Sequence, residues 1–237
     1  MVKQQFVSPM STSERVLGLG YIPIHVFFLP WLLNYTYTNV LRNMNVVLTG
    51  PSIDLIYYIV SFLFILFFLF RFMKASFLTF LDDFLKGLFS AAVGILFSFI
   101  LMGLISLLLL VFNLEGANPN TAQVISQTRQ NAGTIILIAV VLAPIVEETL
   151  FRGALFGTLL EKNRLLAYII SALLFAVYHL WQYVYTTGFD WKMLLYVLEY
   201  LPPALALCWC YERTGSVWPP VLLHAAINLV SALILLD

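Results

Sequence analysis

Apolar residues fall into seven long runs along the chain, separated by shorter polar stretches. Each run has about the 20 residues that a helix needs to cross the hydrocarbon core of a bilayer. Pro23 and Pro30 interrupt the first run, so a count of six to eight crossings fits the pattern. The pattern predicts an all-α, polytopic helical membrane protein of about seven transmembrane helices, over residues 17–36, 53–72, 86–112, 134–158, 165–184, 190–211 and 217–236.

The composition agrees with this fold class. Of the 237 residues, 62% are hydrophobic and only 10% are charged, whereas soluble domains have about 45–50% apolar and about 25% charged residues. The formal net charge is zero, and no basic run suggests a nucleic-acid surface. We therefore expect the membrane lipid bilayer as the surroundings of this protein and no nucleic-acid partner.

The distribution of Lys and Arg predicts the orientation. With seven crossings and the N-terminus inside, eight of these side chains fall in inner segments and three in outer ones, and the cytoplasmic side has the excess. Residues 1–18 contain few basic residues and no small-residue cleavage site after a short apolar core, which indicates a tail rather than a signal peptide. We expect a cytoplasmic N-terminus and an external C-terminus.

A polar stretch from Asn113 to Gly133 divides the chain into two parts. We expect residues 1–120 to hold an N-terminal tail and the first three spans, whose interiors contain almost no ionisable residue. Residues 121–237 contain nearly all the polar residues that are unexpected in a membrane, and we expect them to form the functional core.

The fourth apolar run contains three charges, in the sequence "APIVEETLFRG". Each charge costs roughly 2.5 to 3.5 kcal/mol at mid-helix, and the eleven Leu, Ile, Val and Phe residues between Ile135 and Phe151 return only about 5 kcal/mol. The run therefore inserts poorly unless its charges pair or face a cavity. Glu148 and Arg152 are four residues apart with the acid first, which favours an ion pair.

That pair leaves Glu147 without a partner on its own helix. Pro144 removes a backbone donor just before it and loosens the turn, which makes room for a polar cavity. Glu147 is therefore the charged residue of this run that a structural role does not explain.

Histidines supply the second set of candidate residues. His224 and Asn228 are four residues apart in the last run, so both lie on one helix face. His179 lies late in the fifth run, four residues after Phe175. Such groups are tolerated at membrane depth when they face the interior together. His25 has no polar neighbour at helical spacing, and we interpret it as structural.

Three motifs in this order resemble those of a known family. The sequences "EETLFR" at 147–152, "FAVYH" at 175–179 and "HAAIN" at 224–228 are similar to E-E-x-x-x-R, F-x-x-x-H and H-x-x-x-N. These are the signatures of the CAAX-protease and bacteriocin-processing family, which includes the type II CAAX prenyl endopeptidases. The resemblance covers residues 134–237.

The resemblance implies an intramembrane endopeptidase that cleaves a membrane-associated protein or peptide, lipidated or not. Glu147 would be the general base that activates water, helped by His179, and His224 and Asn228 would stabilise the oxyanion. Glu148 and Arg152 would be the structural pair. A bacterial plasma membrane is the expected location. An alternative on the same scaffold is a non-catalytic membrane immunity or assembly factor, since members of the family occur beside bacteriocin systems.

Whether a metal takes part stays open from the sequence. Glu147, His179 and His224 offer two nitrogens and one oxygen, the ligand types of a catalytic Zn²⁺. The chain lacks the H-E-x-x-H pattern of the usual zinc peptidases, and we expect no tightly bound metal.

Overall fold

The computed structural model describes residues 6–112 and 118–236, and within these ranges the chain is helical with short connections and contains no strand. The fold class predicted from the sequence is confirmed. The α-helices are α1 (Thr12–Pro23), α2 (Leu29–Thr36), α3 (Gly50–Phe68), α4 (Phe70–Asp82), α5 (Phe84–Val111), α6 (Pro119–Leu137), α7 (Ala143–Glu147), α8 (Gly157–Leu160), α9 (Arg164–Tyr178), α10 (Trp181–Thr187), α11 (Lys192–Thr214) and α12 (Trp218–Leu236). Between them lie the π-helical segments η1 (Ile24–Phe28), η2 (Tyr37–Leu41), η4 (Ile138–Leu142) and η5 (Glu148–Phe156) and the 3-10 turn η3 (Arg42–Met44).

Seven apolar helical stretches of the described chain correspond one to one with the seven predicted spans. Five of them are long and apolar enough to cross a membrane, and two are shorter. The protein is therefore a polytopic helical membrane protein. The long stretches are Thr12–Met44, Gly50–Phe68, Phe84–Val111, Pro119–Leu160 and Lys192–Thr214, and the short ones are Arg164–Tyr178 and Trp218–Ile234.

Two boundaries differ from the sequence prediction. The polar stretch 113–133 is helical from Pro119 onward, because the Asn118 side chain accepts the Asn120 N–H at 3.0 Å and caps α6; residues 113–117 lie outside the described ranges. The fifth span stops at Tyr178 instead of running to 184. The His179 side chain contacts the Phe175 carbonyl oxygen at 2.9 Å through Nδ1, and a continuing helix would use that oxygen for its own backbone.

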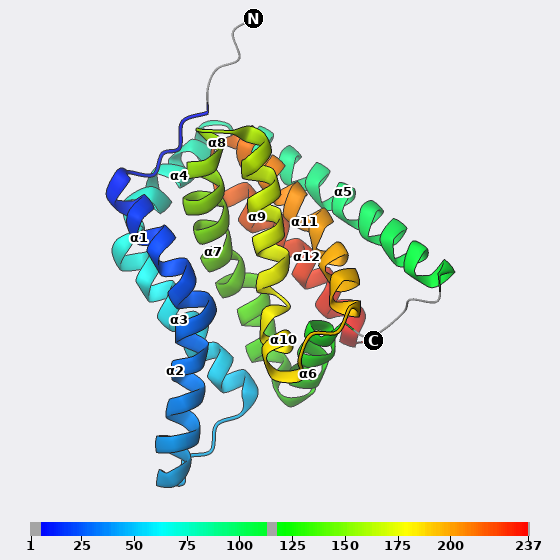
Figure 1. The fold of residues 1–237 in the computed structure, drawn as a ribbon. Coiled ribbons are helices and arrows are strands. Elements are labelled where there is room, and N and C mark those ends of the chain that lie inside the picture. The colour runs from blue at the N-terminus through cyan, green and yellow to red at the C-terminus, as the bar shows by residue number, and fades with distance from the viewer. Residues whose placement is uncertain (1–5, 113–117, 237) are drawn as a thin grey trace, which may run out of the picture.

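The helices surround one central element (Figure 1). The continuous stretch η4–α7–η5 lies at the centre, with α1 packed on η5 and α3 packed on α7. On the other side, α9 packs on η5, α12 packs on η4 and α7, and α11 lies between α5 and α9. The stretch with the three charges is therefore enclosed on both sides, as the cost of those charges in lipid requires.

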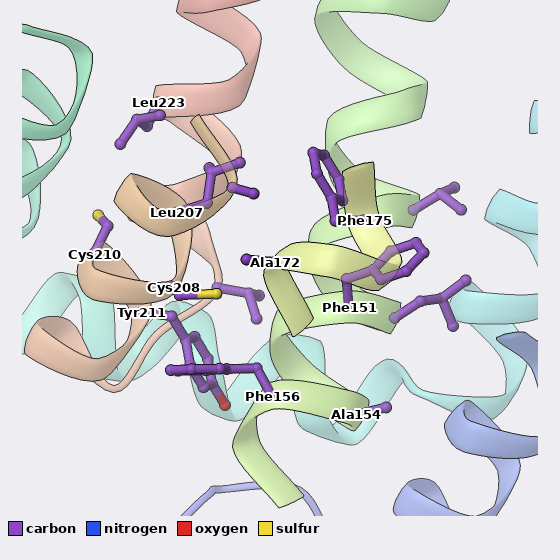
Figure 2. Close-up of a cluster of buried hydrophobic side chains, with 14 of the residues drawn as sticks. Phe151, Ala154, Phe156, Ala172, Phe175, Leu207, Cys208, Cys210, Tyr211 and Leu223 are labelled. Carbon is purple, nitrogen blue, oxygen red and sulfur yellow. The ribbon is translucent and has the colours of Figure 1, made fainter. Parts of the chain in front are cut away.

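The largest of three apolar clusters in the described ranges joins the N-terminal and C-terminal parts of the chain. Figure 2 shows members of this core from η5, α9, α11 and α12. Buried residues of α1, α3 and α4 belong to it as well. Phe151 and Phe175 pack edge to face with ring centroids 5.4 Å apart, a geometry that aromatic pairs prefer. This core fixes η5 against α9 and thereby the distance between the first and second motifs.

Gly94 allows α5 to approach the last helix closely. A Cβ at this position would lie 2.1 Å from Leu223 Cδ1, so a larger residue would push α5 away. Small residues at such crossings let membrane helices pack by van der Waals contact. Leu223 directly precedes His224, so this contact also holds the third motif in place.

An ion pair joins the start of α1 to the end of α8. Both terminal nitrogens of Arg15 donate to the Glu161 carboxylate, and the Ser8 N–H donates to Glu161 Oε1 at 2.9 Å. These hydrogen bonds stabilise the charged carboxylate and hold the pKa of Glu161 below its ordinary value. A group with a lowered folded-state pKa stabilises the fold above the unfolded pKa of about 4.3, and this contribution is lost as the pH falls.

We predict that Glu161→Gln lowers the melting temperature in detergent by roughly 2 °C at pH 7. The difference from the unsubstituted protein should shrink when the pH is lowered from about 7 to about 3, because the carboxyl of the latter takes up its proton as the pH falls. Thermal unfolding followed at both pH values tests this. A difference that persists unchanged at acid pH would contradict the role assigned to the charge.

Candidate active site

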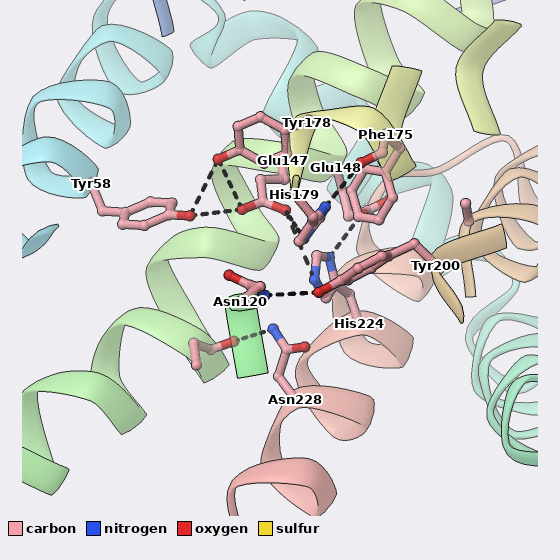
Figure 3. A network of polar contacts seen from close by, with 12 residues as sticks. Tyr58, Asn120, Glu147, Glu148, Phe175, Tyr178, His179, Tyr200, His224 and Asn228 are labelled. Atoms are coloured by element: carbon pink, nitrogen blue, oxygen red, sulfur yellow. Dashed lines mark hydrogen bonds and ion pairs between the residues drawn. The ribbon is translucent and has the colours of Figure 1, made fainter. Parts of the chain in front are cut away.

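Four elements carry the residues that meet at the candidate site (Figure 3). Glu147 ends α7, and Glu148 begins η5 directly after it. His179 caps the C-terminus of α9, and His224 lies near the start of α12. The side chains of these four residues converge on one point inside the helix bundle.

The backbone that carries the first motif is irregular. Pro144 lies at the start of α7, and π-helical segments precede and follow that helix. Proline has no N–H, and its ring collides with the carbonyl four residues earlier, so the helix widens there. Such π-bulges are frequent at functional sites, and this one places Glu147 and Glu148 in different surroundings.

Glu148 is the centre of a buried charge network. Its Oε1 atom accepts from Arg152 Nη1 at 3.0 Å and from His224 Nδ1 at 2.8 Å. Arg152 is fully buried, donates to the Ala204 carbonyl at 3.3 Å, and lies 4.0 Å above the Phe175 ring. The structure thus contains the ion pair that the spacing favours, and the same carboxylate also orients His224.

Glu147 has different partners for its two oxygens. Oε1 accepts from the hydroxyls of Tyr58 at 2.8 Å and Tyr178 at 3.4 Å. Oε2 has no hydrogen-bond partner among the described residues, although the side chain is only 3% exposed. The Nε2 atoms of His179 and His224 each lie 3.9 Å from this oxygen. A buried carboxylate oxygen therefore faces two imidazoles.

Both imidazoles present Nε2 to this oxygen because their Nδ1 atoms are engaged elsewhere. His179 Nδ1 lies against the Phe175 carbonyl, which can only accept, so Nδ1 carries a proton. His224 Nδ1 lies against the Glu148 carboxylate, which accepts from Arg152 as well, so it carries a proton too. Each Nε2 then has a free lone pair and can accept when its ring is neutral, and it donates when its ring is charged.

The spacing of these three atoms suits a water better than a zinc ion. Ligands of a tetrahedral zinc lie about 3.3 Å apart for bonds of about 2.0 Å, less than the 3.9 Å found for both contacts. Within the described ranges, no group of three or more His, Cys, Asp or Glu residues has the arrangement of a metal site. A water about 2.8 Å from each of two atoms, in contrast, bridges any separation up to about 5.6 Å.

Asn228 lies apart from the point of convergence. Its Nδ2 donates to the Ala139 carbonyl in η4 at 2.8 Å (Figure 3). This contact ties α12 to the π-helical segment before α7. Because the amide nitrogen has two hydrogens, a second donor remains on the same atom.

Three tyrosines that shape the site could not be recognised from the sequence. Tyr178 is within the second motif but at one of its variable positions, and Tyr58 is one of twelve tyrosines, in a span with no motif. Tyr200 stacks on His179 with ring centroids 4.6 Å apart. Their common signal, a hydroxyl in an apolar helix, is too frequent in this chain to identify them.

Comparisons with known proteins agree with this geometry. Residues 129–230 match the family described as type II CAAX prenyl endopeptidase, Rce1-like. The UPF0177 protein YxdF of Lactococcus lactis subsp. lactis is 34% identical over 99 residues, which is 41% of this chain and 49% of that protein. YdiL of Bacillus subtilis, named provisionally as a membrane peptidase, is 29% identical over 119 residues, 50% of this chain and 43% of that protein.

These alignments span less than half the length of each relative, and no solved structure matches the chain. The matched segment 129–230 nevertheless contains all three motifs and all of the converging site residues except Tyr58. The resemblance seen in the sequence is therefore confirmed. Residues 129–230, less than half of the chain, are similar to the type II CAAX prenyl endopeptidases.

We predict that Arg152→Ala destabilises the protein by about 3–5 kcal/mol, because it leaves the buried Glu148 carboxylate without its cation. The folded fraction and the melting temperature in detergent measure this. Arg164→Ala is the matched control: it breaks another Arg–Glu pair, with Glu212 at 2.6 Å, whose arginine is 63% exposed, and it should change stability by less than about 1 kcal/mol. Equal stability of both variants would contradict the structural role of Arg152.

Proposed function

We propose that this protein is an intramembrane endopeptidase in which Glu147 activates a water for attack on a peptide bond. The observation that carries the proposal is the Oε2 atom of Glu147, buried, without a hydrogen-bond partner in the described chain, and 3.9 Å from two imidazole nitrogens. A buried carboxylate oxygen without a partner costs stability. A general base needs such an atom, and a structural ion pair does not.

In the proposed reaction, a water binds between Glu147 Oε2 and His179 Nε2. The carboxylate takes one proton from the water while the oxygen attacks the carbonyl carbon of the substrate. The same proton then passes from Glu147 to the leaving nitrogen as the C–N bond breaks. The products are a carboxylic acid and an amine, and Glu147 returns to its charged form.

His224 is the proposed donor to the oxyanion. Its Nε2 can donate only when the ring is charged, because Nδ1 already donates to Glu148. The Glu148 carboxylate, 2.8 Å away, stabilises that charge in the way that a buried carboxylate supports a catalytic histidine. Asn228 would donate to the oxyanion with its second amide hydrogen, which is not used in the hydrogen bond to the Ala139 carbonyl. Preformed donors of this kind stabilise a developing oxyanion strongly.

The proposed substrate is a protein or peptide that reaches the site from the membrane, lipidated or not. The family description names a prenyl endopeptidase, which supports a lipidated substrate. The lipid bilayer is the second partner, in a bacterial plasma membrane with a cytoplasmic N-terminus. A non-catalytic immunity or assembly factor is the alternative, and the variant described next distinguishes the two.

We predict that Glu147→Gln folds normally but cleaves about 10²–10⁴-fold more slowly. The test compares the peptide termini of cells that produce either the unsubstituted protein or this variant, which also identifies the substrate. Glu199→Gln is the control, because Glu199 is a carboxyl of another span that accepts from Asn118 at 2.8 Å. Identical termini in all three strains would favour the non-catalytic alternative.

We predict that a metal chelator leaves the cleavage rate of the purified protein unchanged, because a water held by Glu147 and His179 requires no metal. The measurement follows cleavage of the substrate found above before and after prolonged treatment with EDTA. Loss of activity that zinc restores would show that Glu147, His179 and His224 move closer together around a metal.

A further inference from the structure

His25 lies outside the family match, yet it is connected to the proposed active site. The side chain is fully buried, and both ring nitrogens have partners. Nδ1 lies 2.9 Å from the Ser61 hydroxyl, and Nε2 lies 2.9 Å from the Tyr57 hydroxyl and 3.2 Å from the Tyr178 hydroxyl. The imidazole therefore joins the first span to α3 and α9. A structural role for a buried histidine requires only hydrogen-bond partners for both ring nitrogens. His25 is also connected through a hydroxyl to the carboxylate of Glu147.

Tyr178 provides that path. Its hydroxyl lies 3.2 Å from His25 Nε2 and 3.4 Å from Glu147 Oε1. A tyrosine has one hydroxyl proton, so it can donate to only one of these acceptors at a time. Both distances are long for a hydrogen bond, as expected when two acceptors share one donor. The acceptor that Tyr178 serves depends on which of His25 and Glu147 attracts the proton more strongly.

When Glu147 is charged, the hydrogen bonds that link it to His25 can all be donated in the direction of Glu147. Tyr178 donates to Glu147 Oε1, and a proton on His25 Nε2 points at the oxygen of Tyr178 or Tyr57. The Ser61 hydroxyl then donates to Nδ1 and accepts in turn from the Tyr21 hydroxyl at 3.2 Å. Tyr57 donates to the His25 carbonyl at 3.0 Å. Each of these four hydroxyl protons has an acceptor in this arrangement.

When Glu147 is neutral, the opposite direction is available. A neutral carboxyl is a weaker acceptor than a carboxylate, so Tyr178 can donate to His25 Nε2 instead. The ring proton is then on Nδ1, which donates to Ser61. The change moves no net charge through the membrane, since the ring gives the Nε2 proton to a water molecule and takes up a proton from water at Nδ1.

We propose that His25 is a positioning residue for Glu147, whose ring proton moves from Nε2 to Nδ1 when Glu147 loses its charge. While Glu147 is charged and can accept a proton, Tyr178 donates to it. Once Glu147 has taken up the proton, Tyr178 donates to His25 in the first span instead. This inference rests on the proposed function only in that Glu147 changes its charge during turnover.

The test is nitrogen NMR of detergent-solubilised protein labelled with ¹⁵N-histidine. The chain has three histidines, and His25→Gln identifies the signals of His25. In the unsubstituted protein at neutral pH, the shifts of His25 should show the proton on Nε2. In Glu147→Gln, which has no carboxylate charge, they should move toward a proton on Nδ1. Unchanged His25 shifts in this variant would overturn the proposal.

Two further variants show whether the coupling runs through Tyr178. In a Tyr178→Phe background, Glu147→Gln should no longer move the His25 shifts, because the connecting hydroxyl is absent. Glu199→Gln, which removes a different carboxylate, should leave them unchanged in the unsubstituted background. A shift that persists without Tyr178 would overturn the proposed route. These spectra require no substrate, so they decide the inference even if the protein cleaves nothing.

The functional counterpart compares two substitutions of His25 on the substrate found with the Glu147 variant. His25→Gln keeps an amide donor near the position of Nε2, and His25→Leu keeps none. We expect His25→Leu to lower kcat about tenfold with KM unchanged, and His25→Gln to retain most of the rate. Equal loss in both variants, or a change in KM alone, would contradict a positioning role.

Discussion

One oxygen atom, Oε1 of Glu148, holds the charged interior of this protein together. It accepts from Arg152 and from His224, so a single carboxylate neutralises the buried guanidinium and fixes the ring of a histidine from another span. Because the three groups belong to η5 and α12, the ion pair that makes the charges tolerable in lipid also positions the proposed oxyanion donor. Stability and proposed catalysis therefore share the same contact, and neither can be altered alone.

The adjacent carboxylate is held in the opposite way. Among the described residues no Lys or Arg pairs with Glu147, and hydroxyls from α3 and α9 donate to one of its oxygens. Hydroxyl donors orient a carboxylate without fixing its charge as an arginine would. Two neighbouring glutamates thus have different environments: Glu148 accepts from a buried guanidinium, and Glu147 accepts from hydroxyls.

The sequence predicted the fold and the motif residues well, but it could not predict what lies between the motifs. Helical spans follow from hydrophobic runs, and the spacing of Glu148 and Arg152 was sufficient to expect their pair. The sharing of Glu148 with His224 depends on how α12 packs on α7, and Tyr58 and Tyr178 carry no spacing signal. His25 was interpreted as structural because its partners come from other helices. The division of the chain at residue 120 stays a prediction, and the site draws Tyr58 from the first part.

The short length of α9 has a consequence for the surrounding membrane. With 15 residues it rises about 22 Å, less than the roughly 30 Å of hydrocarbon in a typical bilayer. Lipid beside a short span thins to match it, and His179 stands at the end of that span. The hydrolytic reaction proposed for this protein consumes water, and the local thinning shortens the distance that water must travel from the headgroup region to the carboxylate.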